Sequence, residues 1–331
     1  MDSSAAPKLP TAADVEDTAR LLKGVAVRTP LLTSAVLDHF TGARVFLKAE
    51  IFQHTGSFKF RGAYNCIARI PASRRVGGVV AYSSGNHAQG VAAAAKLLGL
   101  PAVIVMPSDA PALKRERTRA LGPEIVLYNR ERDSREEIAA RIASERGATL
   151  IPPYDHALVI AGQGTVGREI AEELTALKLK PDLVLVPASG GGLAAGIALA
   201  VKQNHPAARI MTVEPAGFDD HARSFRSGRR ERNAKLAGSI CDALLAPEPG
   251  EITFEITRRL VGEGLAVSEA EVRAAIAFAF RELKLVVEPA GAAALAALLA
   301  CGLELEGKVA VVVLSGGNID PELFASAIGG S

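Results

Sequence analysis

Short runs of β-branched and other apolar residues alternate with helical segments along almost the whole chain. The runs occupy residues 45–48, 78–82, 102–106, 124–128, 182–187, 209–213 and 309–314. Segments with a helical period separate them, at residues 87–98, 110–121, 134–146 and 165–177. Strands that alternate with helices of this length form parallel sheets joined by crossover helices. The sequence therefore predicts an α/β fold with open parallel sheets and helices on both faces.

The chain has 331 residues, which is more than one typical domain needs, so two lobes are expected. Lysine plus arginine (38) nearly balances aspartate plus glutamate (36), which argues against nucleic acid as a partner. Three cysteines without paired spacing favour a reducing, cytoplasmic location. No membrane association is expected, because the most apolar segment, residues 289–303, is shorter than the roughly 20 residues of a membrane span.

Three glycine-containing turns each follow a predicted strand. They are SSGNH at residues 83–87, SGGGL at 189–193 and SGGN at 315–318. Ligands bind at the carboxyl ends of the strands in open α/β sheets. Glycine lets the backbone approach a ligand closely, and amides at a helix start bind phosphate. The turns therefore predict a site for a phosphate-containing ligand.

The second turn taken alone also supports a different class of enzyme. Residues 190–195 fit the pattern G-x-G-x-x-A, and Glu214 follows at the end of the next predicted strand. This arrangement is typical of dinucleotide binding, in which the acidic residue contacts the ribose. A nicotinamide-dependent dehydrogenase is thus an alternative, although it leaves the other two turns unexplained.

Lys59 lies between Phe58 and Phe60 in the sequence. Apolar surroundings lower the pKa of a lysine and leave the neutral amine that attacks an aldehyde. The alternative is a lysine whose aliphatic stem packs while its ammonium reaches water.

GSFKFRGA (56–63), SSGNHAQG (83–90), SGGGL and SGGN occur in this order. Together they resemble the fold-type-II pyridoxal-phosphate enzymes, in particular the serine/threonine dehydratase and serine racemase family. The similarity runs from Arg28 to Asn318. It implies a two-lobed fold like that of tryptophan synthase β, with residues 1–71 and 152–331 in a large cofactor-binding domain and 72–151 in a small mobile domain. It also implies a homodimer.

The resemblance further implies how pyridoxal phosphate is held. Lys59 would bind the cofactor as a Schiff base and later take the substrate's α-proton. Phe58 and Gly238 would cover the two faces of the cofactor ring, and Asn86 would bind its hydroxyl group. Ser315 would face the ring nitrogen, where a neutral hydroxyl favours elimination over transamination. The phosphate would lie against the backbone amides of consecutive residues, namely Ser189, Gly190, Gly191, Gly192 and Leu193.

The reaction implied is β-elimination from a 3-hydroxy amino acid, which yields a 2-oxo acid and ammonia. L-Serine or L-threonine is the first expectation, because their dehydration is the group's commonest activity. The substrate's α-carboxylate would be bound by residues of the first glycine turn: Ser83, Ser84, Asn86 and His87. For His87, the alternative is a helix-capping imidazole.

Two residues resemble the serine racemase and 3-hydroxyaspartate dehydratase branch and keep both activities as alternatives. Ser84 stands where typical threonine dehydratases have alanine, and its hydroxyl would return a proton during racemisation. Arg135 aligns with an arginine that meets a second carboxylate on the ligand, as a guanidinium fork can. The alternative for Arg135 is a surface residue paired with neighbouring glutamates.

Residues 214–220 (EPAGFDD) resemble the divalent-cation loop of the same branch. Glu214 and Asp220 would supply carboxylates and Phe218 a backbone carbonyl, an oxygen shell suited to Mg²⁺ or Ca²⁺. The alternative is a pair of surface acids.

Overall fold

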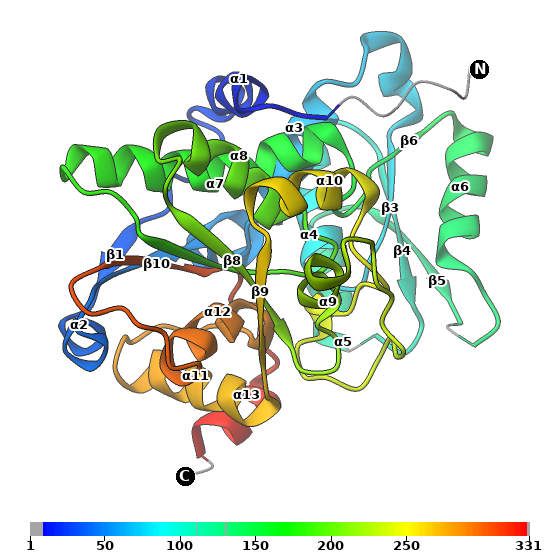
Figure 1. The fold of residues 1–331 in the computed structure, drawn as a ribbon. Coiled ribbons are helices and arrows are strands. Elements are labelled where there is room, and N and C mark those ends of the chain that lie inside the picture. The colour runs from blue at the N-terminus through cyan, green and yellow to red at the C-terminus, as the bar shows by residue number, and fades with distance from the viewer. Residues whose placement is uncertain (1–8, 111, 130, 330–331) are drawn as a thin grey trace.

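Two separate β-sheets form the framework of the computed structural model, which describes residues 9–110, 112–129 and 131–329 (Figure 1). The larger sheet has six strands in the order β1-β2-β10-β7-β8-β9, and the smaller has four in the order β5-β4-β3-β6. The predicted α/β class is thus confirmed. Every strand of the smaller sheet comes from residues 79–150. The domain boundaries at 71/72 and 151/152 stay a prediction.

The larger sheet is parallel except at one edge, where β1 runs antiparallel to β2. Its central strand β10 has the sequence VAVVVL and is buried along its whole length. A strand buried on both faces is a continuous apolar run rather than an alternating one. The strand bounds are β1 (Leu31–Thr33), β2 (Arg44–Ala49), β7 (Leu183–Pro187), β8 (Arg209–Pro215), β9 (Glu263–Val267) and β10 (Val309–Leu314).

Helices cover both faces of the larger sheet (Figure 1). On one face lie α7 (Ala157–Ala176) and α8 (Gly192–Asn204), with α1 (Ala12–Leu22) and α10 (Glu251–Leu260) outside them. On the other face lies α12 (Pro289–Ala300), which packs against α11 (Glu269–Arg281), and α11 contacts α13 (Pro321–Gly329). The remaining helices beside this sheet are α2 (Ala35–Thr41) and α9 (Asp220–Ser227).

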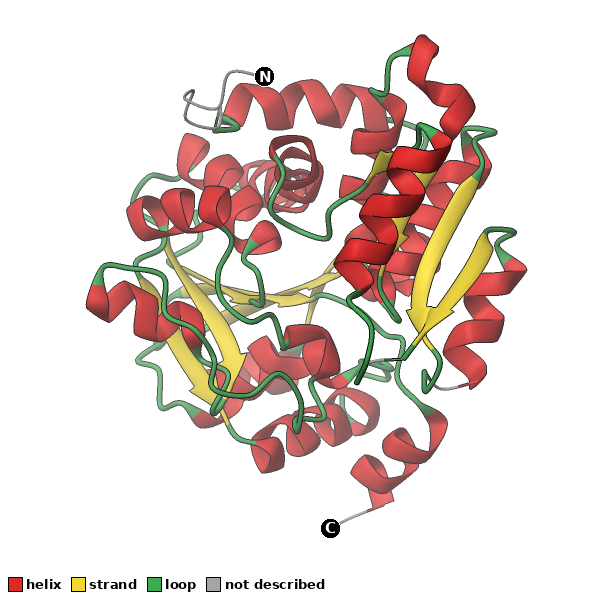
Figure 2. Ribbon diagram, turned by 90° about the vertical axis from the view of Figure 1, so that its right-hand side faces the viewer, coloured by secondary structure: helices red, strands yellow, loops and turns green. Residues whose placement is uncertain are grey.

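The smaller sheet is parallel throughout and also lies between helices (Figure 2). Its strands are β3 (Val79–Tyr82), β4 (Ala102–Pro107), β5 (Glu124–Tyr128) and β6 (Thr149–Leu150). Helices α3 (Lys59–Ala68) and α4 (Asn86–Leu97) share an apolar core with one face, and α6 (Arg135–Arg146) packs on the other. Helix α5 (Ala112–Ala120) lies next to α4.

Helix starts follow local chemistry in the sequence. Ser268 and Glu271 form a reciprocal capping box at the start of α11, as their spacing indicates. Helix α12 has Pro289 in its first turn, where proline's missing N–H costs no hydrogen bond. Among the described residues, no helix combines the length and apolar character needed to cross a membrane.

Candidate active site

A pocket lies where the carboxyl ends of β3, β7 and β10 meet, and all three glycine turns contribute to its lining. The structure brings most of the predicted site residues into this lining. They are Phe58, Lys59, Ser83, Ser84, Asn86, His87, Arg135, Ser189, Gly190, Gly191, Gly192, Leu193 and Ser315. Outside the lining lie Gly238 and the predicted cation ligands Glu214, Phe218 and Asp220.

Lys59 is the first residue of α3, and its Nζ donates a hydrogen bond of 2.8 Å to the Pro153 carbonyl. The amine also lies 5.2 Å from the centre of the Phe58 ring. Burial lowers the pKa of Lys59 to about 8. The lowering expected for a lysine between two phenylalanines is therefore found, and a useful fraction of the amine is neutral near neutral pH.

The second glycine turn leads into α8, which begins at Gly192 without any side-chain cap. Gly191 has a φ of 92°, a left-handed conformation that glycine adopts without strain. A Cβ on Gly190 would stand 2.2 Å from the Tyr154 ring, so only glycine fits there. The uncapped amides at this helix start form the anion site that a phosphate group requires.

Ser189 is the first residue of the second glycine turn. Its Oγ accepts a hydrogen bond of 3.1 Å from the Ala246 amide, and its carbonyl accepts one of 2.7 Å from the His221 ring. The hydroxyl proton is therefore free to donate toward the pocket.

The first glycine turn leads into α4, whose N-cap residue is Gly85. Because glycine has no side chain, the first amides of this helix are uncapped. Residues 83–87, which include this helix start, line the pocket. The His87 ring, in contrast, is buried and lies 2.9 Å from the Ile151 carbonyl oxygen, to which its Nε2 donates. Burial, with Lys59 nearby, lowers the pKa of His87 to about 3, so its ring is neutral. His87 therefore contributes to an anion site through its backbone rather than as a cation.

Both polar atoms of the Asn86 side-chain amide are hydrogen-bonded. Its Nδ2 donates to Glu288 Oε1 at 2.6 Å, and its Oδ1 accepts from Asn318 Nδ2 at 2.8 Å. The second hydrogen on Nδ2 remains for a ligand such as the predicted ring hydroxyl. Burial, followed by repulsion from Asp242, raises the pKa of Glu288 to about 7.

Arg135 begins α6, at the carboxyl edge of the smaller sheet. Its Cζ lies 5.4 Å from the centre of the Tyr82 ring, and its Nε donates to Glu136 at 2.8 Å. The partner expected for a surface arginine is thus present, yet Arg135 and Tyr82 both line the pocket. A cation at a helix start opposes the helix dipole, and Glu136 and Glu137 in the same turn offset this effect.

Gly238 does not line the pocket. It is an exposed loop residue with a φ of 108°, and a Cβ there would meet nothing within 4 Å. The following segment, residues 242–246, lines the pocket instead. A contact between Gly238 and the cofactor ring therefore finds no support in this structure, because the loop does not pack against the pocket.

Glu214, Phe218 and Asp220 are all buried, and Glu214 and Asp220 lie close to each other and to His221. The alternative of surface acids is therefore wrong. Glu214 accepts hydrogen bonds of 3.0 Å from the amides of His221 and Ala222. A carboxylate that is enclosed and bonded in this way is not open to a ribose, so the structure gives no support to the dinucleotide alternative.

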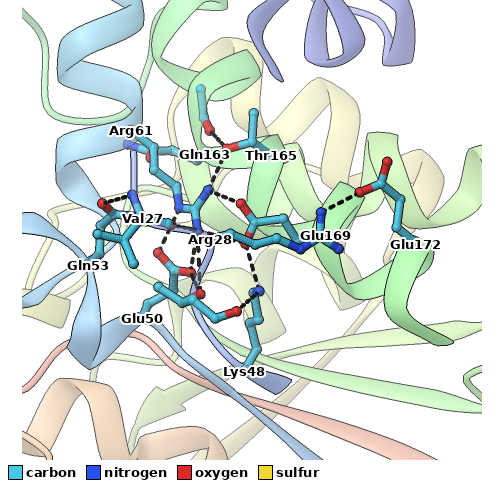
Figure 3. A network of polar contacts seen from close by, with 12 residues as sticks. Val27, Arg28, Lys48, Glu50, Gln53, Arg61, Gln163, Thr165, Glu169 and Glu172 are labelled. Carbon is cyan, nitrogen blue, oxygen red and sulfur yellow. Dashed lines mark hydrogen bonds and ion pairs between the residues drawn. The ribbon is translucent and has the colours of Figure 1, made fainter. Parts of the chain in front are cut away.

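A buried ionic network surrounds Arg61 in the first turn of α3 (Figure 3). Arg61, two residues after Lys59, donates to both carboxylate oxygens of Glu50 and of Glu169. Lys48 donates to Glu169 at 2.7 Å. Although burial opposes it, Arg61 and Lys48 hold the pKa of Glu169 below its usual value. The network joins β2, α3 and α7 close in sequence to Lys59, the first residue of α3.

Several pocket residues were not predicted from the sequence. Tyr82, Tyr154 and Glu288 lie in the lining, and His221 contacts the phosphate-binding turn from outside it. None of them stands in a glycine turn. Only the position of Tyr82 directly before SSGNH carried a usable signal.

The comparisons with known proteins agree with this geometry. Residues 22–316 match the model of the family described as pyridoxal-phosphate dependent enzymes. The chain is 44% identical to L-threo-3-hydroxyaspartate ammonia-lyase of Saccharomyces cerevisiae over 97% of each chain. It is 43% identical to L-threonine ammonia-lyase of Thermotoga maritima over 95% of this chain and 77% of the relative. Maize serine racemase superposes with a TM-score of 0.90 at 36% identity, covering 97% of this chain and 98% of that one.

Lys59 at the start of α3 and the uncapped glycine turn at the start of α8 provide the amine and the phosphate site that this cofactor requires. The chain belongs to the pyridoxal-phosphate-dependent enzymes, in the fold-type-II group that contains serine racemase, threonine ammonia-lyase and 3-hydroxyaspartate ammonia-lyase.

Proposed function

We propose that this protein is an ammonia-lyase that converts 3-hydroxyaspartate to oxaloacetate and ammonia. The observation that carries the proposal is Arg135, whose guanidinium lies in the same pocket lining as Lys59 and the two uncapped helix starts. A substrate with one carboxylate needs only one anion site beside the lysine. The planar guanidinium of Arg135 can bind a second carboxylate of the substrate through two parallel N–H hydrogen bonds.

When bound, pyridoxal phosphate supplies an electron sink that acidifies the Cα–H bond of an attached amino acid and permits loss of its β-hydroxyl group. The phosphate would lie against the start of α8, with the Ser189 hydroxyl as a further donor. Phe58, Asn86 and Ser315 would contact the cofactor ring.

The chain's own residues then carry out three tasks. Lys59 takes the α-proton at Nζ, where the lowered pKa makes a neutral amine accessible. The amides at the start of α4 hold the α-carboxylate. Arg135 binds the distal carboxylate while the Tyr82 ring supports the guanidinium from one face. Movement of residues 72–151 toward the larger sheet would exclude water during turnover.

Dehydration of L-serine or L-threonine, the first expectation from the sequence, is the second candidate. The 43% identity to L-threonine ammonia-lyase of Thermotoga maritima favours it. Such a substrate would leave Arg135 paired with Glu136 alone. Serine racemisation is the third candidate, favoured by Ser84 in the pocket lining. Homodimeric assembly and a cytoplasmic location also stay predictions.

Arg135→Ala is expected to lower kcat/KM for 3-hydroxyaspartate about 10- to 100-fold, because a charge-assisted bond to a carboxylate contributes roughly 1.5–3 kcal/mol. For L-serine the loss should stay below about threefold, since serine has no distal carboxylate for Arg135 to bind. Ammonia and 2-oxo acid release with each substrate measures both values.

Arg141→Ala is the matched control, because Arg141 lies on the same helix with its side chain 68% exposed. Its replacement should change neither value. Equal losses for both substrates in Arg135→Ala would remove Arg135 from the substrate site and return L-serine or L-threonine to first place.

Ser84→Ala is expected to suppress formation of D-serine from L-serine at least about tenfold while much of the elimination remains. The physical reason is that racemisation needs a proton carrier on the face opposite Lys59, whereas elimination does not return a proton to Cα from that face. Chiral analysis of serine together with pyruvate release measures the two outcomes. Unchanged racemisation in this variant would refute the role of Ser84.

A further inference from the structure

His221, on the side of the phosphate-binding turn away from the pocket, is a completely buried residue in the first turn of α9. Its Nε2 lies 2.7 Å from the Ser189 carbonyl oxygen. A carbonyl can only accept, so Nε2 must carry the proton of the neutral ring. Nδ1 is then a bare acceptor, and it is buried with no hydrogen-bond partner among the described residues.

Two buried carboxylates lie beside this ring. One ligand atom each from Glu214, Asp220 and His221 lie within 4.8 Å of one another. Asp220 Oδ1 accepts from Asn233 Nδ2 at 2.6 Å, whereas Asp220 Oδ2 is buried without a partner in the described part of the chain. Glu214 receives two backbone amides and keeps a spare lone pair on each oxygen.

The cluster thus contains more acceptors than donors. Arg223, three residues after Asp220, donates to Asn233 Oδ1 and the Arg232 carbonyl, and it lies 3.5 Å from Asp219. Buried acceptors without donors are costly, and a cation resolves the cost for all of them together.

We propose that His221 is a ligand of this cation site through Nδ1, and that the site therefore prefers a divalent transition metal such as Zn²⁺ or Co²⁺ to Mg²⁺ or Ca²⁺. Mg²⁺ and Ca²⁺ favour shells made of oxygen, whereas imidazole suits transition metals. A histidine ligand also commonly donates its other ring N–H to a backbone carbonyl, and the Ser189 carbonyl has this position here. The oxygen-only shell of Glu214, Phe218 and Asp220 is thereby extended by one nitrogen.

The proposed ligand connects the cation to the cofactor site. One hydrogen bond joins the ring to Ser189, and the ring's Cε1 lies 2.7 Å from where a Cβ on Gly191 would stand. The orientation that a metal imposes on the imidazole is thus transmitted to the turn that holds the cofactor phosphate.

Equilibrium dialysis of the chelator-treated holoenzyme against Co²⁺, with Mg²⁺ or Ca²⁺ as competitor, tests the preference. We expect Co²⁺ to bind at least about tenfold more tightly than Mg²⁺. In His221→Gln the side-chain amide can still donate to the Ser189 carbonyl, but Nδ1 is lost. That variant should bind Co²⁺ at least about tenfold more weakly, with little change for Mg²⁺.

Cobalt-edge X-ray absorption of the wild-type holoenzyme gives a second readout that requires no variant. A bound imidazole adds outer-shell scattering that carboxylates do not produce, and we expect to observe it. Absence of this scattering, equal affinity for Mg²⁺ and Co²⁺, an unchanged Co²⁺ affinity in His221→Gln, or no bound cation at all would each overturn the proposal. The last result would instead indicate a proton held within the cluster.

Discussion

Lys59→Ala is expected to abolish covalent attachment of pyridoxal phosphate and to lower turnover at least about a thousandfold. The variant loses both the amine that binds the cofactor and the base that accepts the α-proton, and acid–base catalysis alone contributes about 10²–10⁴-fold. Borohydride reduction followed by mass spectrometry measures attachment directly. The wild-type protein should retain the cofactor mass, and the variant should not.

The pH dependence of cofactor loading follows from the same residue. With a pKa of about 8, roughly a tenth of the Lys59 amines are neutral at pH 7, against a few in ten thousand at the ordinary lysine pKa of 10.5. Because the neutral amine is the nucleophile, the rate of loading should rise with pH and level off above about pH 8.

Lys114 provides the matched control for Lys59. It lines the same pocket, but its Nζ donates to Asp242 and lies outside the glycine turns. Lys114→Ala should therefore retain the covalently attached cofactor. If Lys59→Ala also retained it, with an unchanged rate, Lys59 would not be the cofactor lysine.

The parts of the fold that could be predicted are those whose signal is local. The central strand β10 carries its own burial pattern in VAVVVL, and the capping box of α11 needs only Ser268 and Glu271. The glycine turns were found because a close approach of backbone to ligand limits the residues that fit. These signals need no knowledge of distant contacts.

The elements that were missed depend on partners far away in the sequence. Strand β9 contains Gly264 and is defined by its pairing with β8, while β6 has only two residues. The first half of α7 was missed because it is buried almost all round and so lacks an amphipathic period. Glu288 and Tyr154 reach the pocket through the arrangement of the two sheets, which the linear pattern does not report.

A third kind of information is the tautomer of a buried side chain. The sequence placed His221 next to the predicted cation loop, but nothing in it indicated that Nε2 would donate to Ser189. Only the folded structure shows which ring nitrogen has no hydrogen-bond partner among the described residues. Predictions of ligand sets from motifs alone are therefore weakest for histidine, whose two nitrogens have different roles.

Arg61→Met is expected to lower the free energy of unfolding by about 3–5 kcal/mol, the usual cost of removing one partner from a buried ion pair. Arg61 and Lys48 balance Glu50 and Glu169 in the network of Figure 3, and none of these side chains is more than 11% exposed. Without Arg61, the buried Glu50 carboxylate loses its cationic partner, and Glu169 keeps only Lys48. Urea denaturation followed by circular dichroism measures the loss.

Arg146→Met is the matched control, because Arg146 also makes two hydrogen bonds to one glutamate, Glu124, but its side chain is 45% exposed. An exposed pair of this kind contributes up to about 1 kcal/mol, so its loss should be several times smaller. Similar losses in the two variants would show that burial does not set the cost.

The network should also make stability depend on pH in acid. The pKa of Glu169 is lowered in the folded protein, so its contribution to stability is complete above the unfolded value of 4.5 and is lost as the pH falls below it.

Adding Glu50→Gln to Arg61→Met removes the surplus buried charge and should restore part of the stability. If it restored none, the cost would lie in lost packing rather than in charge. Because Arg61 is two residues from Lys59, the same pair of variants also tests whether the network maintains the geometry of cofactor attachment.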